Sequence, residues 1–227
     1  MTNRGPIITL LAVAVLAAVL LVVNTTVQSQ TASRETGTPP VATTLPATTP
    51  PVSTSPPAAA PEQAAYAGRT SGNEATIAIA VRGGQAAAYV CDGHRVEAWL
   101  QGTISGGRLT LQGAHGAGAT GTLEANAVFG TVSVNGKQWP YSARLAAPPA
   151  GLYQGNGSVN GAPNRIGWIV LPDGSQVGVR NKNGVREPAP ALDPQALGAV
   201  PVEGSRIEPQ QVSGDTQVVG VAGAPPA

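Results

Sequence analysis

The aromatic residues limit where this chain can build a core. All eight of them, three Trp, four Tyr and one Phe, lie between Tyr66 and Trp168 of the 227 residues. The stretches on either side are rich in Ala, Pro, Thr, Ser and Gly, and these residues bury too little apolar surface to offset the entropy lost on ordering. The sequence therefore predicts one folded domain, residues 66–182, between two segments that have no core of their own.

An apolar run, Ile7–Val23, follows a short N-terminal stub, residues 1–6. Its length is at the lower limit for crossing a bilayer core of about 30 Å at about 1.5 Å per residue. Because Arg4 precedes the run and the next basic residue is Arg34, we expect the stub to be cytoplasmic and the domain to lie outside the membrane. Cleavage near Ser29 is the alternative, and it would give a secreted protein.

Cysteine usage agrees with export into a bacterial envelope. Cys91 is the only cysteine, so the chain cannot form an internal disulfide bond. Exported eukaryotic domains of this size commonly carry disulfides, so their absence favours a bacterial protein.

Two Pro-rich segments flank the domain. Residues 24–65 are a Pro/Thr/Ser/Ala tract with eight prolines between Pro39 and Pro61, and this composition predicts a disordered, extended linker. Residues 183–227 mix Pro and Gly with acidic residues and are predicted to be a disordered tail, with room for one short extended piece near Gln211–Val219.

The domain itself is patterned as short strands. Apolar and polar residues alternate with a period of two, and Gly-Gly, Asp-Gly and Asn-Gly pairs separate the runs. No stretch has helical spacing with caps. The pattern predicts an all-β fold, either a small antiparallel barrel or a two-sheet sandwich built of hairpins.

Two of the turn pairs predict strand registers. If Asn135 and Gly136 are a two-residue loop, Val132 lies opposite Trp139 in the hairpin. The same argument for Asp92 and Gly93 sets Cys91 opposite His94, and it places Trp99 on the solvent side of its strand, away from Tyr89.

Charge and motifs argue against several functions. The 66–182 domain has nine basic and five acidic residues, but the basic ones are scattered singly, unlike the cluster of a nucleic-acid site. Residues 116–121 match G-x-G-x-x-G, but no helix follows them, so we interpret them as a flexible loop and expect no cofactor. The two histidines, His94 and His115, are not at ligand spacing, so we expect no metal site.

Cys91 and His94 are the candidate catalytic residues. Side by side at the end of a hairpin, they would have the geometry of a thiolate–imidazole pair. The competing interpretation is an inert buried cysteine, because Asp92 is used by the turn and no other carboxylate or amide is placed to orient His94.

Trp99, with Arg95 and Glu97, is the candidate binding site. A large aromatic side chain among polar residues can anchor a saccharide or a protein partner. The competing interpretation is that a second sheet, or the segment 151–154, covers Trp99.

Four strings of the sequence resemble a group of uncharacterised actinobacterial proteins. They are YVCDG at 89–93, EAWL at 97–100, G-L-Y at 151–153 and GWIVLPDGSQVGV at 167–179. Those proteins have a single N-terminal span, a Pro/Thr-rich linker and a small β domain. The resemblance implies the compartment and the fold, and it transfers no activity or site residue.

These observations together suggest a non-catalytic, membrane-anchored binding or accessory module of the cell envelope. Its partner would be the membrane, through residues 7–23, and an envelope polysaccharide, lipid or protein. An envelope enzyme that uses Cys91 and His94 is one alternative, and a purely structural spacer is another.

Overall fold

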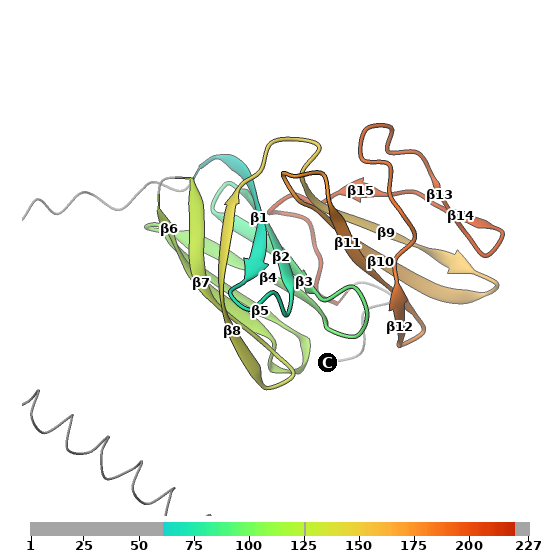
Figure 1. Ribbon diagram of the computed structural model, residues 1–227, viewed down its shortest axis with the longest axis horizontal. Helices are drawn as coiled ribbons and strands as arrows, with labels where there is room; N and C mark the ends of the chain where they lie inside the picture. The colour runs from blue at the N-terminus through green and yellow to red at the C-terminus, as the bar shows by residue number, and fades with distance from the viewer. Residues whose placement is uncertain (1–60, 125, 221–227) are drawn as a thin grey trace, which may run out of the picture. The chain divides into compact units, whose positions relative to one another are not determined.

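The computed structural model describes residues 61–124 and 126–220 (Figure 1). These residues form strands and one 3-10 turn, Ala114–Gly116, and contain no α-helix. The predicted all-β fold is therefore confirmed. No helix within the described ranges is long and apolar enough to cross a membrane. The anchor expected at 7–23 lies outside them, as does the linker up to residue 60. The prediction of disorder is wrong for the end of that linker, because residues 63–65 pair with a neighbouring strand.

The first eight strands close into an antiparallel barrel, coloured cyan to yellow-green in Figure 1. They are β1 (Gln63–Thr70), β2 (Thr76–Arg82), β3 (Gln85–Cys91), β4 (Glu97–Ser105), β5 (Arg108–Gly113), β6 (Gly118–Glu124), β7 (Ala127–Val134) and β8 (Lys137–Leu145). Each strand pairs with the next, and β8 closes the barrel on β1 from Tyr66↔Leu145 to Thr70↔Tyr141. Of the two predicted architectures, the barrel is the one that this part of the chain adopts.

Side-chain alternation gives the barrel wall two buried faces. In β2, Ile77 and Ile79 point into the barrel core, while Ala78 and Ala80 belong to a second cluster on the outside. Successive strand residues point to opposite faces, and the small outward alanines let another layer approach closely. An apolar run without polar alternation therefore indicates a strand that is covered on both sides.

The hairpin predicted at Asn135 and Gly136 is confirmed. Both residues have positive φ, 52° and 74°, as a tight two-residue turn between twisted strands requires. The register is also the expected one, with Val132 opposite Trp139.

The register predicted at Asp92 and Gly93 is wrong. β3 and β4 pair Cys91 with Glu97 and Tyr89 with Trp99, so the loop between them is 92–96 rather than two residues. The partner of Tyr89 moves by three residues relative to the prediction. Because an odd shift exchanges the two faces of a strand, Trp99 lies on the same side as Tyr89.

The side chain of Asp92 stabilises this wider loop. Oδ1 of Asp92 accepts hydrogen bonds from the backbone N–H groups of His94, Arg95 and Val96 at 2.8, 2.8 and 2.9 Å. An Asp side chain that bonds its own following backbone replaces the hydrogen bonds of a tighter turn. The Asp-Gly pair therefore indicates a turn here but not its length.

The Gly-rich stretch 116–121 is not the flexible loop that we expected. Its second half lies in β6, where Gly121 is opposite Gly130 of β7. A Cβ on Gly121 would come within 2.7 Å of the Tyr141 hydroxyl and 2.8 Å of Cγ1 of Val128. Glycine is required there by close packing inside the barrel.

A second, five-stranded antiparallel sheet, orange in Figure 1, follows the barrel. Its strands are β9 (Gly151–Val159), β10 (Ala162–Val170), β11 (Gln176–Lys182), β12 (Val185–Pro188) and β15 (Gln210–Gln211), in the order β12-β11-β10-β9-β15. One face of this sheet, with Leu152, Ile169 and Val179, packs in the same cluster as the outward alanines of the barrel. The other face, with Ile166 and Trp168, forms a third cluster.

The prediction of a disordered tail is wrong for residues 183–220. This segment supplies β12, β15 and a hairpin of β13 (Val200–Val202) and β14 (Ser205–Ile207). Its side chains Leu192, Val200, Val202 and Ile207 are at most 4% exposed and pack against Trp168. The tail covers the outer face of the second sheet and is part of the fold.

An ionic cluster holds the β13–β14 hairpin to β11. The buried Arg180 donates from Nη1 to Oε1 of Glu187 and, at 2.8 Å, to Oε1 of Glu203 in the hairpin turn. Lys182 donates from Nζ to Oε2 of Glu203 at 2.7 Å. These hydrogen bonds lower the pKa of Glu203 from 4.5 to about 2, and the bond from Arg180 has the larger effect.

We expect acid to loosen this hairpin. A carboxylate whose pKa is lower in the folded state stabilises the fold above its unfolded pKa, and that contribution is lost as the pH falls through the folded value. For Glu203 the loss should occur between about pH 4.5 and pH 2. Amide exchange of Val202 and Ile207, measured across this range, should accelerate more in the wild type than in Glu203→Gln; identical pH profiles would contradict the assignment.

Candidate functional site

The structure separates the two candidate catalytic residues. Cys91, at the end of β3, is fully buried in the cluster between barrel and second sheet, and its cross-strand partner is Glu97. His94 lies in the exposed part of the 92–96 loop. Burial raises the pKa of the Cys91 thiol to about 12, so the thiolate needed for nucleophilic attack is scarce at neutral pH.

We therefore expect Cys91 to resist alkylation in the folded protein. At pH 8, iodoacetamide should modify it at least about a hundredfold more slowly than in guanidinium chloride, because a thiol must be both exposed and ionised to react. Mass spectrometry of the full chain measures both rates. Fast native alkylation, or a turnover that Cys91→Ser abolishes, would instead support the enzyme alternative.

Trp99 is not a surface anchor, and the interpretation that a second sheet covers it is the correct one. It is 7% exposed, and its ring lies 4.2 Å from that of Tyr89, centroid to centroid. The backbone of Gly167 in β10 packs directly on both rings. Of the other two residues proposed for this site, Arg95 is exposed in the loop, whereas the side chain of Glu97 is only 4% exposed.

A buried arginine that sequence reasoning missed completes this cluster. Arg165 of β10 is 1% exposed, and its Cζ lies 4.0 Å from the centroid of the Trp99 ring. Its Nη2 donates to the carbonyl of Val218 at 2.7 Å. Desolvation lowers the pKa of Arg165 to about 10, an effect that the negative charge of Glu97 opposes, so the guanidinium stays charged at neutral pH.

Glu97 is the centre of the polar contacts between the two sheets. Its Oε2 accepts from Asn181 Nδ2 at 3.2 Å and from Arg186 Nε at 3.1 Å, and its Oε1 accepts from the Tyr89 hydroxyl at 3.3 Å. Two of the three residues proposed as a binding site, Trp99 and Glu97, therefore take part in the contacts that join the second sheet and the tail to the barrel, whereas Arg95 does not.

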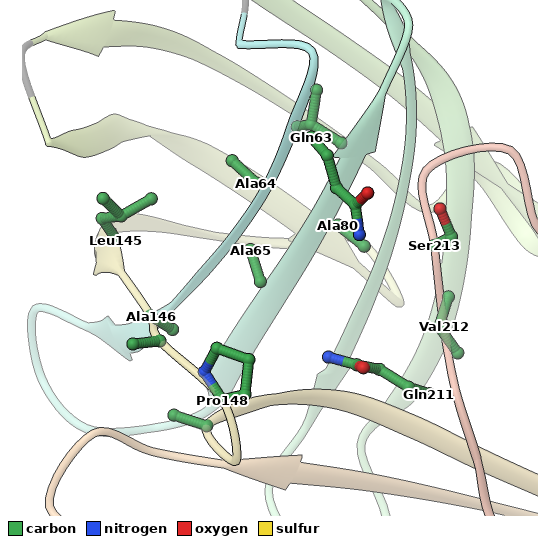
Figure 2. Close-up of a pocket in the computed structure, with 13 residues that line it drawn as sticks. Gln63, Ala64, Ala65, Ala80, Leu145, Ala146, Pro148, Gln211, Val212 and Ser213 are labelled. Atoms are coloured by element: carbon green, nitrogen blue, oxygen red, sulfur yellow. The ribbon is translucent and has the colours of Figure 1, made fainter.

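A pocket of about 470 Å³ lies where the barrel, the 146–150 connection and the tail meet (Figure 2). Small apolar side chains form most of its lining, with two glutamines and a serine among them. The lining residues are Gln63, Ala64, Ala65, Ala80, Val81, Leu145, Ala146, Ala147, Pro148, Ala150, Gln211, Val212 and Ser213. We call it the junction pocket.

The junction pocket combines an apolar lining with a neutral rim. None of its lining residues carries a charge. Leu145, which is 47% exposed, adds a large apolar side chain to this lining. Concave apolar sites with a few polar groups are the usual form of ligand-binding sites in proteins.

Sequence reasoning could not find this pocket. Its lining comes from β1, β2, the end of β8, the connection to β9 and the tail, and the tail was expected to be disordered. Most alanines of the lining lie in stretches rich in Ala and Pro, and such stretches contain no motif that indicates a binding site. The only sequence signal was the period of two in β2, which places Ala80 on the outside of the barrel. Ala65 belongs to the segment that the sequence predicted as linker.

Comparison with known proteins gives no relative on which to base a function. No protein-family model matches the chain, and neither characterised proteins nor solved structures yield a significant match.

Proposed function

We propose that this chain is a non-catalytic binding module that a membrane anchor at residues 7–23 displays in the bacterial envelope. The junction pocket is its ligand site. The observation that carries this proposal is the uncharged, largely apolar lining of a pocket with the exposed Leu145 at its edge.

The chemistry of the lining favours binding over catalysis. General acid–base catalysis, metal binding and phosphate binding all need carboxylates, imidazoles or cations, and no such group lines the pocket. Saccharide stacking needs an aromatic face, which the lining also lacks. An uncharged ligand with small apolar groups, a protein segment or an acyl chain, is the best match.

Binding can be tested by filling the pocket. Ala65 lies in β1 and projects into the space shown in Figure 2, so Ala65→Phe should block it. Ala196→Phe is the matched control, because Ala196 is exposed in the tail and does not line the pocket. The probes are capped uncharged pentapeptides and monolaurin, and the readout is the shift in Tm of the full chain.

We expect at least one probe class to raise Tm in the wild type and in Ala196→Phe but not in Ala65→Phe. If neither class stabilises the wild type, or if the blocked variant responds equally, the proposed ligand site is wrong. Membrane display is tested separately: an antibody to a C-terminal tag should label intact spheroplasts, and the tag should sediment with membranes.

A further inference from the structure

We infer that the occupant of the junction pocket is an extended, uncharged peptide that adds as a strand to the open end of β1. This inference rests on the proposed function and names its ligand class. The peptide would contribute backbone hydrogen bonds to β1 and place small side chains against the alanines of the pocket.

The first observation concerns the N-terminal end of β1, which pairs with β2 but not with β8. Its pairing with β2 runs through Gln63, and the carbonyl of Glu62 still accepts from Gly83 N–H at 2.9 Å. Its pairing with β8 begins only at Tyr66. Ala65 adds one bond, in which its carbonyl accepts from Ala146 N–H at 2.8 Å, and the chain then continues through Pro148 and Pro149 without further pairing to β1.

Alternation of the ladder shows which groups are free. The carbonyl of Glu62 points to β2 and that of Ala65 points to the β8 side, so the N–H and C=O of Gln63 also point to the β8 side. Within the described ranges no backbone group pairs with Gln63 on that side. Gln63 lines the junction pocket, so an unpaired strand edge borders it.

Within the described ranges, the tail strand that also lines the pocket has a similar unpaired edge. β15 pairs with β9 through Gln210 and Gln211, and Val212 N–H donates to the carbonyl of Leu152 at 2.9 Å. By the same alternation, the backbone N–H and C=O of Gln211 point away from β9. Gln211 also lines the pocket, so a second strand segment with backbone groups that do not pair with β9 borders it.

These groups distinguish a peptide from an acyl chain. An extended peptide satisfies free donors and acceptors of a strand edge, which is how many domains recognise peptides. The side-chain amides of Gln63 and Gln211 can also bond to peptide groups. An acyl chain would cover the same groups without bonding to them, and a buried polar group without a partner is destabilising. The uncharged lining matches a peptide without charged side chains.

The test separates the backbone from the side chain at one position. Gln63→Pro removes the N–H that faces the pocket but no pairing with β2, and proline is tolerated at the first residue of a strand. Gln63→Ala keeps the N–H and removes only the side chain. The probes are acetylated, amidated pentapeptides of Ala, Val and Thr, their copies N-methylated at alternate amides, and monolaurin, each titrated against the full chain in detergent.

We expect the unmethylated peptides to bind, and N-methylation or Gln63→Pro to weaken binding about five- to tenfold, the equivalent of one hydrogen bond. Gln63→Ala should weaken it less. Peptide binding that ignores both N-methylation and Gln63→Pro, or binding of monolaurin alone, would overturn the inference and leave the proposed function in place. If neither probe class binds the wild type, both fail; if Gln63→Pro does not fold, the N-methylated peptides decide.

Discussion

A chain that ends at Lys182 is expected to lose its second sheet. The deletion removes β12, β15 and the hairpin β13–β14, which pair with the second sheet or cover its outer face. It also removes the buried aliphatic side chains Leu192, Val200, Val202, Ile207, Val212 and Val218, each at most 4% exposed. Trp168, which is 1% exposed in the full fold, would be left facing solvent.

The expected loss is comparable to the stability of a whole domain. A buried aliphatic side chain stabilises a fold by about 1.5–3 kcal/mol, so losing all six would cost about 9–18 kcal/mol as an upper estimate. Natural domains are stable by only about 5–15 kcal/mol. We therefore expect the backbone amides of β9–β11 to lose their protection from exchange, whether the barrel stays folded or unfolds.

The matched control is a chain that ends at Gly220, which keeps all the strands that the structure describes. Urea unfolding followed by tryptophan fluorescence, together with amide exchange of β9–β11, compares the two chains. Equal unfolding midpoints and equal protection would mean that the tail is dispensable, as the sequence alone predicted, and that the cluster around Trp168 is not needed.

The second large effect is expected from Gly167→Val. Gly167 lies in β10 where it faces the barrel, and a Cβ there would come within 2.5 Å of Tyr89 Cζ and 2.7 Å of Trp99 Cζ2. Both rings are buried, so neither can turn aside. Overpacking of a buried contact costs about 1–3 kcal/mol, and we expect the upper end because the sheet must separate from two aromatic rings.

Gly198→Val is the control for the same change in side chain. No atom lies within 4 Å of a Cβ at Gly198, and its φ is outside the positive region, so its effect should stay within about 0.5 kcal/mol. The free energy of unfolding of the two variants is compared in urea, and a red shift of tryptophan emission should accompany Gly167→Val alone. A cost no larger than that of Gly198→Val would show that Gly167 is not at a close contact.

Much of the barrel follows from local sequence signals. Alternation in β2 and the turn at Asn135 and Gly136 gave the right strands, and the turn also gave the right register because positive φ at both residues fixes a two-residue loop. The pair Asp92 and Gly93 looked equivalent. Its loop is wider because the Asp92 carboxylate accepts hydrogen bonds from three following N–H groups. An Asp-Gly pair is compatible with both this wider loop and a two-residue turn, so the sequence does not distinguish them.

The candidate site was less predictable. The 92–96 loop places Trp99 on the opposite face of its strand from the one predicted, so Trp99 is a buried contact of the second sheet and not a surface anchor. The same loop leaves His94 exposed while Cys91 is buried. The sequence did not indicate the role of Arg165, because a lone arginine in a strand is normally exposed. It is buried here against Trp99, the carbonyl of Val218 and the side-chain amide of Gln154.

The sequence by itself determined where a core could form, that it would be built of strands, and where several chain reversals occur, since side-chain period and backbone φ are properties of neighbouring residues. Only the tertiary structure decided that residues 183–220 are ordered, that Trp99 is buried and that the junction pocket exists. The tail has too few apolar residues to fold alone, and it becomes ordered because the outer face of β10, with Ile166 and Trp168, offers its scattered aliphatic side chains a surface to cover.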